Sequence, residues 1–412
     1  MSNPKTRIAI VGGGPAGLTL GLLLHKHGIP FAVFELRQRP TDEELAEPSG
    51  SLDMHEKSGL AALRACGLFD EAISLTGDCT EEQKIAAKNG NIIYEDADGS
   101  SENRPELYRH DLLKLLLSHL PSDSIQWGCK LVSAKRIADS GVELDFGAKG
   151  KHVFDLVVGA DGAWSRVRPL LTDTKPRYAG IHNITINVRQ IGTKRKDLAA
   201  LIGSGTFTCL ANRHGVFSQR ATQDSARIYV MISTEDEHFG TTSGLASKTP
   251  TQAKDPLTGG DGILSQWGEI IKQLVGVACD DESAHNGGAY LDIKPFHTLP
   301  AGNTWEHRSD ATLIGDAAHL MNPPAGEGVN IAMLDALLLS QAIAKAHKTA
   351  GPGLSSFGEA LDSSIREFEV DMAKRALEMA EGTQEVSKVM FGGEDGSTDM
   401  ANWFRQMFRS QK

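Results

Sequence analysis

The chain has 412 residues, of which 40% are hydrophobic and 23% are charged, and these proportions are typical of a globular protein in water. This length exceeds that of a usual single hydrophobic core, so we expect two closely packed domains. The net charge of -11 argues against nucleic acid or an anionic membrane surface as the main partner. Five scattered cysteines without a CxxC pair favour reduced thiols over a disulfide framework or a zinc site.

The N-terminal region has the pattern of a strand–helix–strand unit. Residues 7–11 form a short apolar run that ends at glycines, as a buried parallel strand does. Residues 15–27 have helical apolar spacing and end at Gly28, and residues 31–35 predict a second strand. The first apolar run already belongs to this unit, which leaves no room for a signal peptide, and no apolar stretch approaches the ~20 residues that span a bilayer. We therefore expect a soluble, cytoplasmic protein. We also expect it to be a monomer.

The middle of the chain has a different pattern. From residue 183 to about 232, period-two alternation between turn residues predicts a separate, largely antiparallel sheet. The polar segment 233–262 lacks periodicity and is predicted to be a mobile surface insertion. Further elements are expected as a helix at 111–120, strands at 155–160 and 311–314, helices at 329–348 and 357–390, and a short amphipathic end.

A glycine-rich turn follows the first strand. Gly12, Gly14 and Gly17 satisfy GxGxxG: the first allows a tight turn, the second lets the backbone approach a pyrophosphate, and the third allows close helix–strand packing. The following helix presents free N–H groups to phosphates. Glu35, at the end of the second strand, can accept hydrogen bonds from a ribose. The motif predicts a dinucleotide site but does not distinguish NAD from FAD. The same site includes Pro15, Ala16, Leu36 and Arg37.

A second site, some three hundred residues later, points to a flavin. Gly315 and Asp316 follow a strand, where a carboxylate can bind the ribityl or ribose hydroxyls of an extended cofactor. A Pro/Gly loop then opens a helix near Val329, whose positive end favours the negative charge of a reduced flavin. The predicted contacts in this loop are Pro323, Gly326, Glu327, Gly328, Val329 and Asn330.

Taken in chain order, these motifs resemble those of the class A flavoprotein aromatic hydroxylases, the para-hydroxybenzoate hydroxylase-like group. The resemblance covers nearly the whole chain and includes the glycine-rich turn with Glu35, residues 155–168, and the stretch that begins at Gly315. In that family the Asp-Gly pair matched by Asp161 and Gly162 is implicated in binding both FAD and the nicotinamide cofactor. The resemblance therefore implies that Asp161 is a cofactor-binding residue.

Within this group the sequence is most similar to the tetracycline-inactivating flavin monooxygenases. Four segments are similar to that subfamily: 50–55, 67–69, 109–112 and 315–321. The similarity implies that Asp53, with its neighbours Ser51 and Leu52, lies near the isoalloxazine. It also implies that Arg109 contacts the phosphate–ribose region of FAD and that Asp316 binds FAD.

Structural roles are the alternatives for two of these residues. Asp53 could instead cap a helix that begins near His55, and Arg109 could pair with Asp111 or Glu106.

Several positions depart from the tetracycline-inactivating pattern. That subfamily has a glutamine, an arginine and a histidine where this chain has Thr185, Phe207 and Tyr229. Pro324 replaces a phenylalanine beside the substrate, and an acidic run at 42–47 replaces an arginine thought to meet NADPH. Tetracycline is therefore not implied as the physiological substrate, and NADPH and NADH both stay open as reductants. The substrate-facing candidates are Thr185, Phe207, Tyr229, Pro323 and Met390.

The predicted fold is α/β and has three parts. A Rossmann-like FAD-binding domain covers 1–176 and 296–345, a mainly antiparallel β-sheet substrate domain covers 177–295, and a helical segment covers 346–412. The predicted function is hydroxylation of a small polycyclic or phenolic substrate, which could be a tetracycline-like antibiotic or another aromatic secondary metabolite.

In the predicted mechanism NADPH or NADH reduces FAD, O2 adds to give a C4a-hydroperoxyflavin, and the distal oxygen is transferred to a phenol- or enol-like carbon. The cofactor performs this chemistry, so we expect no protein nucleophile and no metal, with Asp53 as a supporting residue. His319, beside the Gly-Asp pair, is more consistent with a structural role than with that of a base. The alternatives are an NAD-dependent dehydrogenase, a flavin halogenase or reductase, and a non-catalytic flavin protein.

Overall fold

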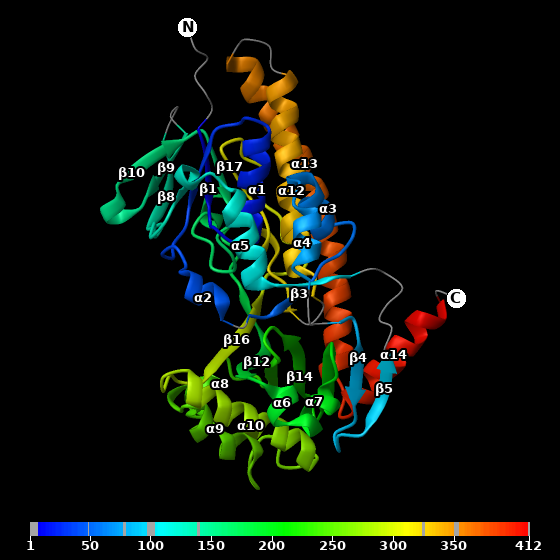
Figure 1. Ribbon diagram of the computed structural model, residues 1–412. Coiled ribbons are helices and arrows are strands. Elements are labelled where there is room, and N and C mark those ends of the chain that lie inside the picture. The colour runs from blue at the N-terminus through cyan, green and yellow to red at the C-terminus, as the bar shows by residue number, and fades with distance from the viewer. Residues whose placement is uncertain are drawn as a thin grey trace.

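The computed structural model describes residues 7–47, 49–76, 80–96, 104–137, 141–323, 326–349 and 354–410. This part of the chain contains two large β-sheets, one in the upper and one in the lower half of Figure 1. Strands and helices are mixed along the sequence, and one of the sheets is parallel, so the predicted α/β class is confirmed.

The upper sheet carries the predicted dinucleotide turn and consists of parallel strands in the order β17-β11-β1-β2-β7. Helices pack on it from one side and a three-stranded antiparallel sheet from the other (Figure 1). Strands covered on both faces are buried along their whole length, as three of these are, and two of the three contain only apolar residues. The strands are β1 (Ile8–Val11), β2 (Phe31–Phe34), β7 (Ile125–Gln126), β11 (Leu156–Gly159) and β17 (Ala311–Leu313).

Four helices of this half confirm the helices expected from the sequence. They are α1 (Pro15–Lys26), α5 (Arg109–His119), α12 (Gly328–Thr349) and α13 (Leu354–Phe391). Among the described helices α12 alone is long and apolar enough to cross a membrane, a property that the sequence-based count of apolar runs missed. It packs against α1, α13 and α3 (Gly59–Cys66), and 67% of its most apolar window is buried. Its apolar character is thus that of a core helix.

The lower sheet has seven strands in the order β16-β12-β15-β14-β13-β4-β5. All its neighbouring pairs are antiparallel except β13 with β4, so the prediction of a largely antiparallel sheet is confirmed. The strands are β4 (Gln83–Ala86), β5 (Ile92–Asp96), β12 (Arg177–Val188), β13 (Thr206–Ala211), β14 (His214–Ala221), β15 (Ser225–Ser233) and β16 (Asp292–Thr298).

Three strands correct the predicted division of the chain. β4 and β5 fall inside 1–176, which was assigned to the FAD-binding domain, yet they extend the lower sheet through the pairing of β4 with β13. β16 also runs three residues past the predicted boundary at 295. The local sequence of β4 shows only a short strand, and its partner lies more than a hundred residues away.

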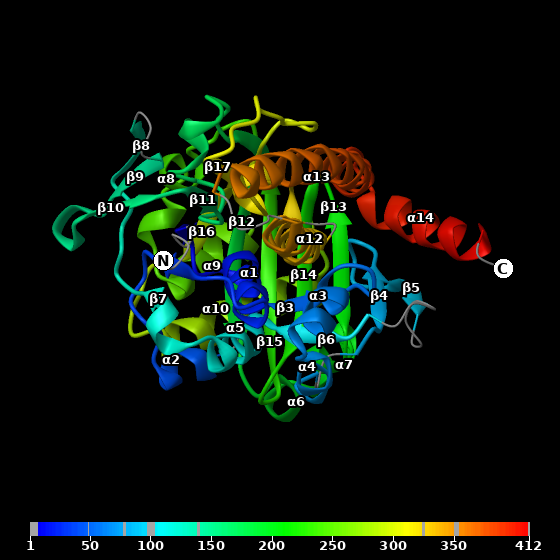
Figure 2. The ribbon, with the colours of Figure 1, turned by 90° about the horizontal axis from the view of Figure 1, so that it is seen from above.

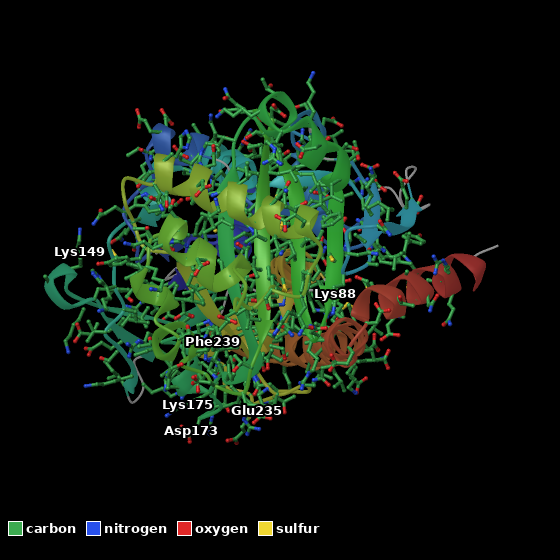
Figure 3. The ribbon with its side chains drawn as sticks, turned by 90° about the horizontal axis from the view of Figure 1, so that it is seen from below. Lys88, Lys149, Asp173, Lys175, Glu235 and Phe239 are labelled. Carbon is green, nitrogen blue, oxygen red and sulfur yellow. The ribbon has the colours of Figure 1, made fainter. Side chains whose placement is uncertain are left out.

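The segment 233–262 was predicted to be a mobile insertion, and that prediction was wrong. It folds into short helices, including α8 (Phe239–Thr242) and α9 (Pro250–Thr258), which begins with a capping box at Thr249. Leu245 and Leu257 are almost completely buried against α10 (Glu269–His285) and the sheet. Figure 3 shows these helices from below, lying across the strands, with Phe239 on the same flank as Glu235. A few apolar side chains at irregular spacing therefore suffice to anchor a polar segment.

Smaller elements connect and flank the two sheets. β3 (Ser51–Asp53) pairs with β6 (Glu106–Tyr108) and lies where the two halves meet in Figure 1. The three-stranded sheet consists of β8 (Ser133–Ile137), β9 (Gly141–Asp145) and β10 (Lys151–Phe154). The remaining helices are α2 (Asp42–Ala46), α4 (Phe69–Ser74), α6 (Ile191–Lys194), α7 (Lys196–Ile202), α11 (Asp316–His319) and α14 (Gly396–Ser410).

Helix α13 is fastened to both sheets. Near its middle, Glu369 is buried and accepts hydrogen bonds from Thr312 of β17 at 2.8 Å and from the indole of Trp305 at 3.1 Å. At its end, Met390 and Phe391 pack in an apolar cluster with Phe217 of the lower sheet. α14 continues over β4, β5 and β13, away from α13 (Figure 2). One continuous helix therefore sets the spacing of the two halves.

Candidate flavin site

The turn after β1 has a geometry that requires two of its glycines. Gly12 has φ +115°, and a Cβ atom there would lie 2.2 Å from the carbonyl oxygen of Ala160. A Cβ atom on Gly17 would lie 2.0 Å from the carbonyl oxygen of Gly12. Gly14, in contrast, has no atom within 4 Å of its Cβ position. The turn is therefore tightly packed on the protein side and leaves open space beside Gly14, where the α1 N-terminus begins.

The carboxylate of Glu35 is buried at the end of β2 and fixes this turn. It accepts a 2.6 Å hydrogen bond from the backbone N–H of Gly13. Its other oxygen accepts hydrogen bonds from the backbone and the side chain of Arg37, at 2.9 and 3.2 Å. The predicted acid thus lies beside the glycine-rich turn, while Leu36 is 60% exposed.

Gly315 brings the two predicted motifs together. Its Cβ position would lie 3.5 Å from the Cβ of Ala16 on α1 and 3.0 Å from the Cβ of Ala332 on α12. Its φ is +61°, a region that glycine enters without strain. The backbone N–H of Gly315 donates to the buried carboxylate of Asp335 at 3.1 Å. Two motifs three hundred residues apart therefore form one continuous surface.

Asp316 lies in a recess at this junction. The residue is exposed by surface area, yet surrounding protein atoms bury it enough to raise the pKa of its carboxyl group. Positive charges on His319, Arg109 and Arg168 offset part of that rise in pKa. A carboxylate that is accessible to solvent yet surrounded by protein atoms is expected for a group that faces a bound ligand.

Arg168 is a site residue for which no role was predicted. It is only 3% exposed and donates from Nε to the carbonyl oxygen of Ala317 at 2.8 Å and from Nη2 to that of Ala163 at 2.8 Å. It thereby holds the loop after β11 against α11. Asp161, in the same loop, accepts 2.6 Å hydrogen bonds from the Ser165 hydroxyl and the backbone N–H of Arg166. Both oxygens of this predicted cofactor ligand are thus engaged within its own loop.

Asn330 joins the β3 segment to the start of α12. Its side chain is fully buried, donates to the carbonyl oxygen of Asp53 at 2.7 Å and accepts from the backbone N–H of His55 at 2.9 Å. Asp53 does not cap a helix, since α3 begins only at Gly59. One carboxylate oxygen of Asp53 faces Nε2 of His55 at 3.3 Å, and the other, Oδ1, is buried without a hydrogen-bond partner in the described part of the chain.

Gly50 is the point where the two halves approach each other. Its Cβ position would lie 3.4 Å from Nε of Arg109 and 3.0 Å from the hydroxyl of Tyr229 on the lower sheet. The backbone N–H of Arg109 also donates to the carbonyl oxygen of Gly50 at 3.0 Å. Arg109 acts on the charge of Asp316, whereas the charges that act on Asp111 are Lys114 and His110. The remaining predicted residues of β3 lie here too: Ser51 donates to Glu106, and Leu52 is buried.

The predicted substrate-facing residues of the lower sheet divide between its two faces. Thr185 and Tyr229 are directly opposite each other on neighbouring strands and are both half-buried. Phe207 is fully buried in the apolar cluster formed with α9 and α10, so its assignment to the substrate site was wrong. Side chains alternate between the faces of a strand, and one position of misalignment moves a residue to the opposite face.

The other two substrate candidates lie on the side of the sheet that faces away from α9 and α10. Met390, at the end of α13, is 4% exposed in the cluster with Phe217. Pro323 is exposed at the end of the described segment, and Pro324 lies outside the described residues.

A cavity of about 720 Å³ adjoins the loop that contains Pro323. It is lined by the first residues of β12, the β13–β14 turn and the end of α13. Asn322 contributes an amide whose Oδ1 is buried without a hydrogen-bond partner in the described part of the chain. Tyr178 forms one wall, and burial raises the pKa of its hydroxyl to about 12, so this phenol is neutral near pH 7. The cavity thus combines aromatic walls with hydrogen-bonding groups next to the loop that contains Pro323.

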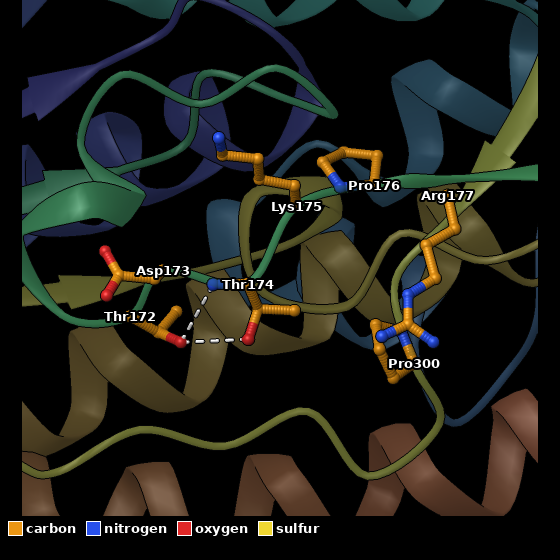
Figure 4. A pocket seen from close by; sticks show the side chains of 7 residues that line it. All are labelled: Thr172, Asp173, Thr174, Lys175, Pro176, Arg177 and Pro300. Carbon is orange, nitrogen blue, oxygen red and sulfur yellow. Dashed lines mark hydrogen bonds between the residues drawn. The ribbon is translucent and has the colours of Figure 1, made fainter.

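Another hollow, of about 750 Å³, lies on the surface at the connection between the halves (Figure 4). Its wall includes Thr172 and Thr174, whose hydroxyls are 2.9 Å apart, together with Lys175 and Arg177. None of the predicted site residues lines it.

His319 has the structural environment that the sequence favoured. Its Nε2 lies 2.5 Å from the carboxylate of Asp335, which is itself fully buried and contacts Arg375 of α13 at 3.3 Å. Burial lowers the pKa of His319, but the Asp335 carboxylate outweighs this and raises it above the ordinary value. The pair fastens α11 to α12 beneath Gly315, and no group of three metal-ligating side chains occurs within the described ranges.

Comparison with known proteins identifies the family. Residues 5–261 and 305–357 match the family described as FAD binding domain. The chain is 34% identical to monooxygenase penA of Penicillium thymicola, over 90% of this chain and 93% of that protein. It is 30% identical to monooxygenase asqM of Emericella nidulans, over 92% and 94%. The chain belongs to the FAD-dependent monooxygenases of the aromatic hydroxylase family.

Solved structures agree with this fold. Klebsiella pneumoniae HpxO complexed with FAD and uric acid is similar with a TM-score of 0.72 and 17% identity, covering 98% of this chain and 93% of that one. Tetracycline destructase Tet(51) is similar with a TM-score of 0.66 and 15% identity, covering 99% and 95%. At these identities the likeness concerns the fold of this monooxygenase and not its substrate.

The residues of this monooxygenase fit FAD. Open space lies beside the Cβ positions of Gly14, Gly326 and Gly328, where a ligand can approach the backbone. The buried Oδ1 of Asp53 has no polar partner in the described part of the chain, and the recessed carboxylate of Asp316 lies close to the charges of Arg109 and Arg168, so both can take up polar groups of a ligand.

Proposed function

We propose that this monooxygenase uses NADH or NADPH and O2 to hydroxylate a phenol- or enol-like carbon of a small polycyclic or phenolic substrate. The family supplies the cofactor and the reaction class. The observation that carries the finer proposal is the meeting of Tyr229 with Gly50 and Arg109, since it brings a half-buried face of the lower sheet against the predicted flavin surface. That face presents hydroxyl groups and an aromatic ring, which suit a flat, oxygen-bearing ligand.

Bound FAD would take up a hydride from the reduced nicotinamide and activate O2 for transfer. The protein's own residues would bind and orient the cofactor and the substrate. We assign the pyrophosphate to the α1 N-terminus beside Gly14, and the ribose hydroxyls to Glu35. Asp316 and Arg109 would bind the central part of the cofactor, and Asp53 would face its ring. The segment 326–328 would allow the ring to approach the backbone.

We assign the substrate to the space between Tyr229 and the cavity that contains Asn322. Thr185 and Tyr229 supply hydroxyl groups on the sheet face, and the buried Asn322 Oδ1 can accept a hydrogen bond from a substrate hydroxyl or N–H. A tetracycline is one member of the class that such a site can accept. The likeness to the tetracycline destructases, however, rests on the fold alone, so a phenolic or polycyclic secondary metabolite is the broader proposal.

The test begins with the purified protein, which should be yellow with the absorbance of oxidised flavin. Oxidation of NADH and of NADPH is then followed together with O2 uptake, across phenols, fused-ring enols and tetracyclines. A true substrate should stimulate reductant oxidation and gain one oxygen atom from isotope-labelled O2, measured by mass spectrometry. Peroxide release measures uncoupled turnover separately.

Protein that stays colourless after incubation with FAD would contradict the cofactor assignment. Turnover without O2 would contradict the monooxygenase reaction and favour a dehydrogenase.

A further inference from the structure

His55 lies between two carboxylates at the edge of the predicted flavin surface. Its Nε2 is 3.3 Å from Oδ2 of Asp53, and its Nδ1 is 3.3 Å from Oε2 of Glu327. Ionised carboxylates only accept hydrogen bonds, so the ring can satisfy both only if both nitrogens carry a proton. With both carboxylates ionised, this geometry favours the positively charged imidazolium form.

The surroundings of His55 maintain this charge. The imidazole is 15% exposed, which shields its two ion pairs from solvent. Asp53, on β3, also faces Nη1 of Arg104 at 3.8 Å, and Glu327 precedes α12 with its side chain 26% exposed. Burial lowers the pKa of His55, but the hydrogen bonds to Asp53 and Glu327 outweigh that effect and raise its pKa to about 9. The imidazolium thus persists across the physiological pH range.

The two partners belong to segments that are far apart in sequence and both border the predicted flavin surface. Asp53 ends β3, and its other oxygen, Oδ1, is buried without a partner in the described residues. Glu327 lies between Gly326 and Gly328, whose Cβ positions face open space. The side chain of Asn330 already binds the backbone of the β3 segment, whereas His55 joins the charged side chains of Asp53 and Glu327.

We infer that His55 is a positioning residue for FAD, which as an imidazolium holds the carboxylates of Asp53 and Glu327 together and so fixes the two segments that border the cofactor. The inference rests on the FAD site and concerns cofactor binding only. Without the proton, two carboxylates would face a neutral ring that can donate to only one of them. The two carboxylate side chains would then move apart, and the segments that carry them would bind FAD less tightly.

The chain contains a matched control in His307. Its Nδ1 lies 2.6 Å from Glu369 and its Nε2 lies 3.0 Å from Asp362, so it too bridges two carboxylates. It fastens α13 to the segment before β17 and contacts none of the predicted flavin residues. A purely structural role of a bridging histidine is therefore measured by His307→Gln.

The experiment measures the dissociation constant of FAD by quenching of flavin fluorescence in the wild type, His55→Gln and His307→Gln at pH values from 7 to 10. We expect His55→Gln to weaken binding about tenfold at pH 7, the loss of roughly one charged hydrogen bond. Wild-type affinity should fall by a similar factor as the pH rises through about 9. His55→Gln should show no such fall, and His307→Gln should change thermal stability while keeping wild-type FAD affinity.

Wild-type affinity and pH dependence in His55→Gln would overturn the inference. If that variant does not fold, Glu327→Gln removes one partner and leaves β3 unchanged, and the same loss of affinity is expected. Independently, NMR of histidine labelled at Cε1 reads the protonation of His55 in the FAD-free protein. A charged ring at pH 7.5 supports the inference, and a neutral ring overturns it, even if FAD binding or turnover fails.

Discussion

Asn330 donates a 2.7 Å hydrogen bond to the carbonyl oxygen of Asp53, a residue 277 positions earlier in the chain. The same amide accepts from the backbone N–H of His55, and no exposed surface remains on Asn330. A single side chain thus pairs one acceptor and one donor at the end of β3.

Replacing Asn330 with alanine should therefore destabilise the protein by about 2–3 kcal/mol, because two backbone groups lose the partner that this fully buried side chain supplies. Urea denaturation of the FAD-free protein measures the change. Asn303→Ala is the control, because Asn303 is only half-buried and its side chain donates a single hydrogen bond, of 2.9 Å, to the carbonyl oxygen of Ala318. Equal losses for the two variants would contradict the prediction.

The glycine-rich turn offers a clean separation of fold from cofactor binding. Gly14 has φ −83° and empty space at its Cβ position, so Gly14→Ala should keep the stability of the FAD-free protein and lose FAD affinity. Gly17→Ala would place a Cβ atom 2.0 Å from the carbonyl oxygen of Gly12 and should prevent folding of the turn. Circular dichroism and FAD titration distinguish the two. Undiminished FAD affinity in Gly14→Ala would show that the space is not used.

Asp316 should show opposite effects on stability and on binding. Because burial raises the pKa of the Asp316 carboxyl in the folded protein, the folded state binds the proton more tightly than the unfolded state. This carboxyl therefore lowers the stability of the fold as the pH rises above the pKa that it has in the unfolded chain. Asp316→Asn should thus be more stable than the wild type near pH 8 when FAD is absent, and the difference should vanish in acid. FAD retention should fall in the same variant. Thermal denaturation across pH and the flavin content after gel filtration test the two effects.

The faces of the lower sheet predict different outcomes for two aromatic residues. Phe207→Ala opens a cavity in a fully buried core and should cost about 3–5 kcal/mol of stability. Tyr229→Phe removes only a hydroxyl next to Gly50, so it should keep stability and raise KM for the substrate. Denaturation and steady-state kinetics are the measurements. A specific change in KM with normal stability in Phe207→Ala would contradict the assignment of faces.

The sequence predicted the elements whose signals are local. A strand followed by GxGxxG, and Gly315-Asp316 followed by a Pro/Gly loop, have residue types that only a few backbone shapes accommodate, and the structure joins them at Ala16 and Ala332. The pairing of β4 with β13 and the orientation of Phe207 could not be predicted, because register and sheet edge depend on distant partners.

His55 and Arg168 were missed for a related reason. Each has a partner that becomes its neighbour only through folding: Glu327 for His55, and the carbonyl oxygen of Ala317 for Arg168. The signal available for His55 was its place two positions after Asp53 in a segment already assigned to the flavin.

The attachment of α13 at its middle and at its C-terminal end limits how this enzyme can admit a substrate. From Glu369, bound to β17, to Met390, packed on the lower sheet, a continuous helix rises roughly 30 Å. An opening motion of the two halves would have to bend helix α13 or pull the buried carboxylate of Glu369 away from its partners. We therefore expect the distance between the two sheets to stay constant during turnover. Ligand exchange would then proceed through local rearrangements of side chains and short loops. The constant distance between the sheets would limit the size of the ligand.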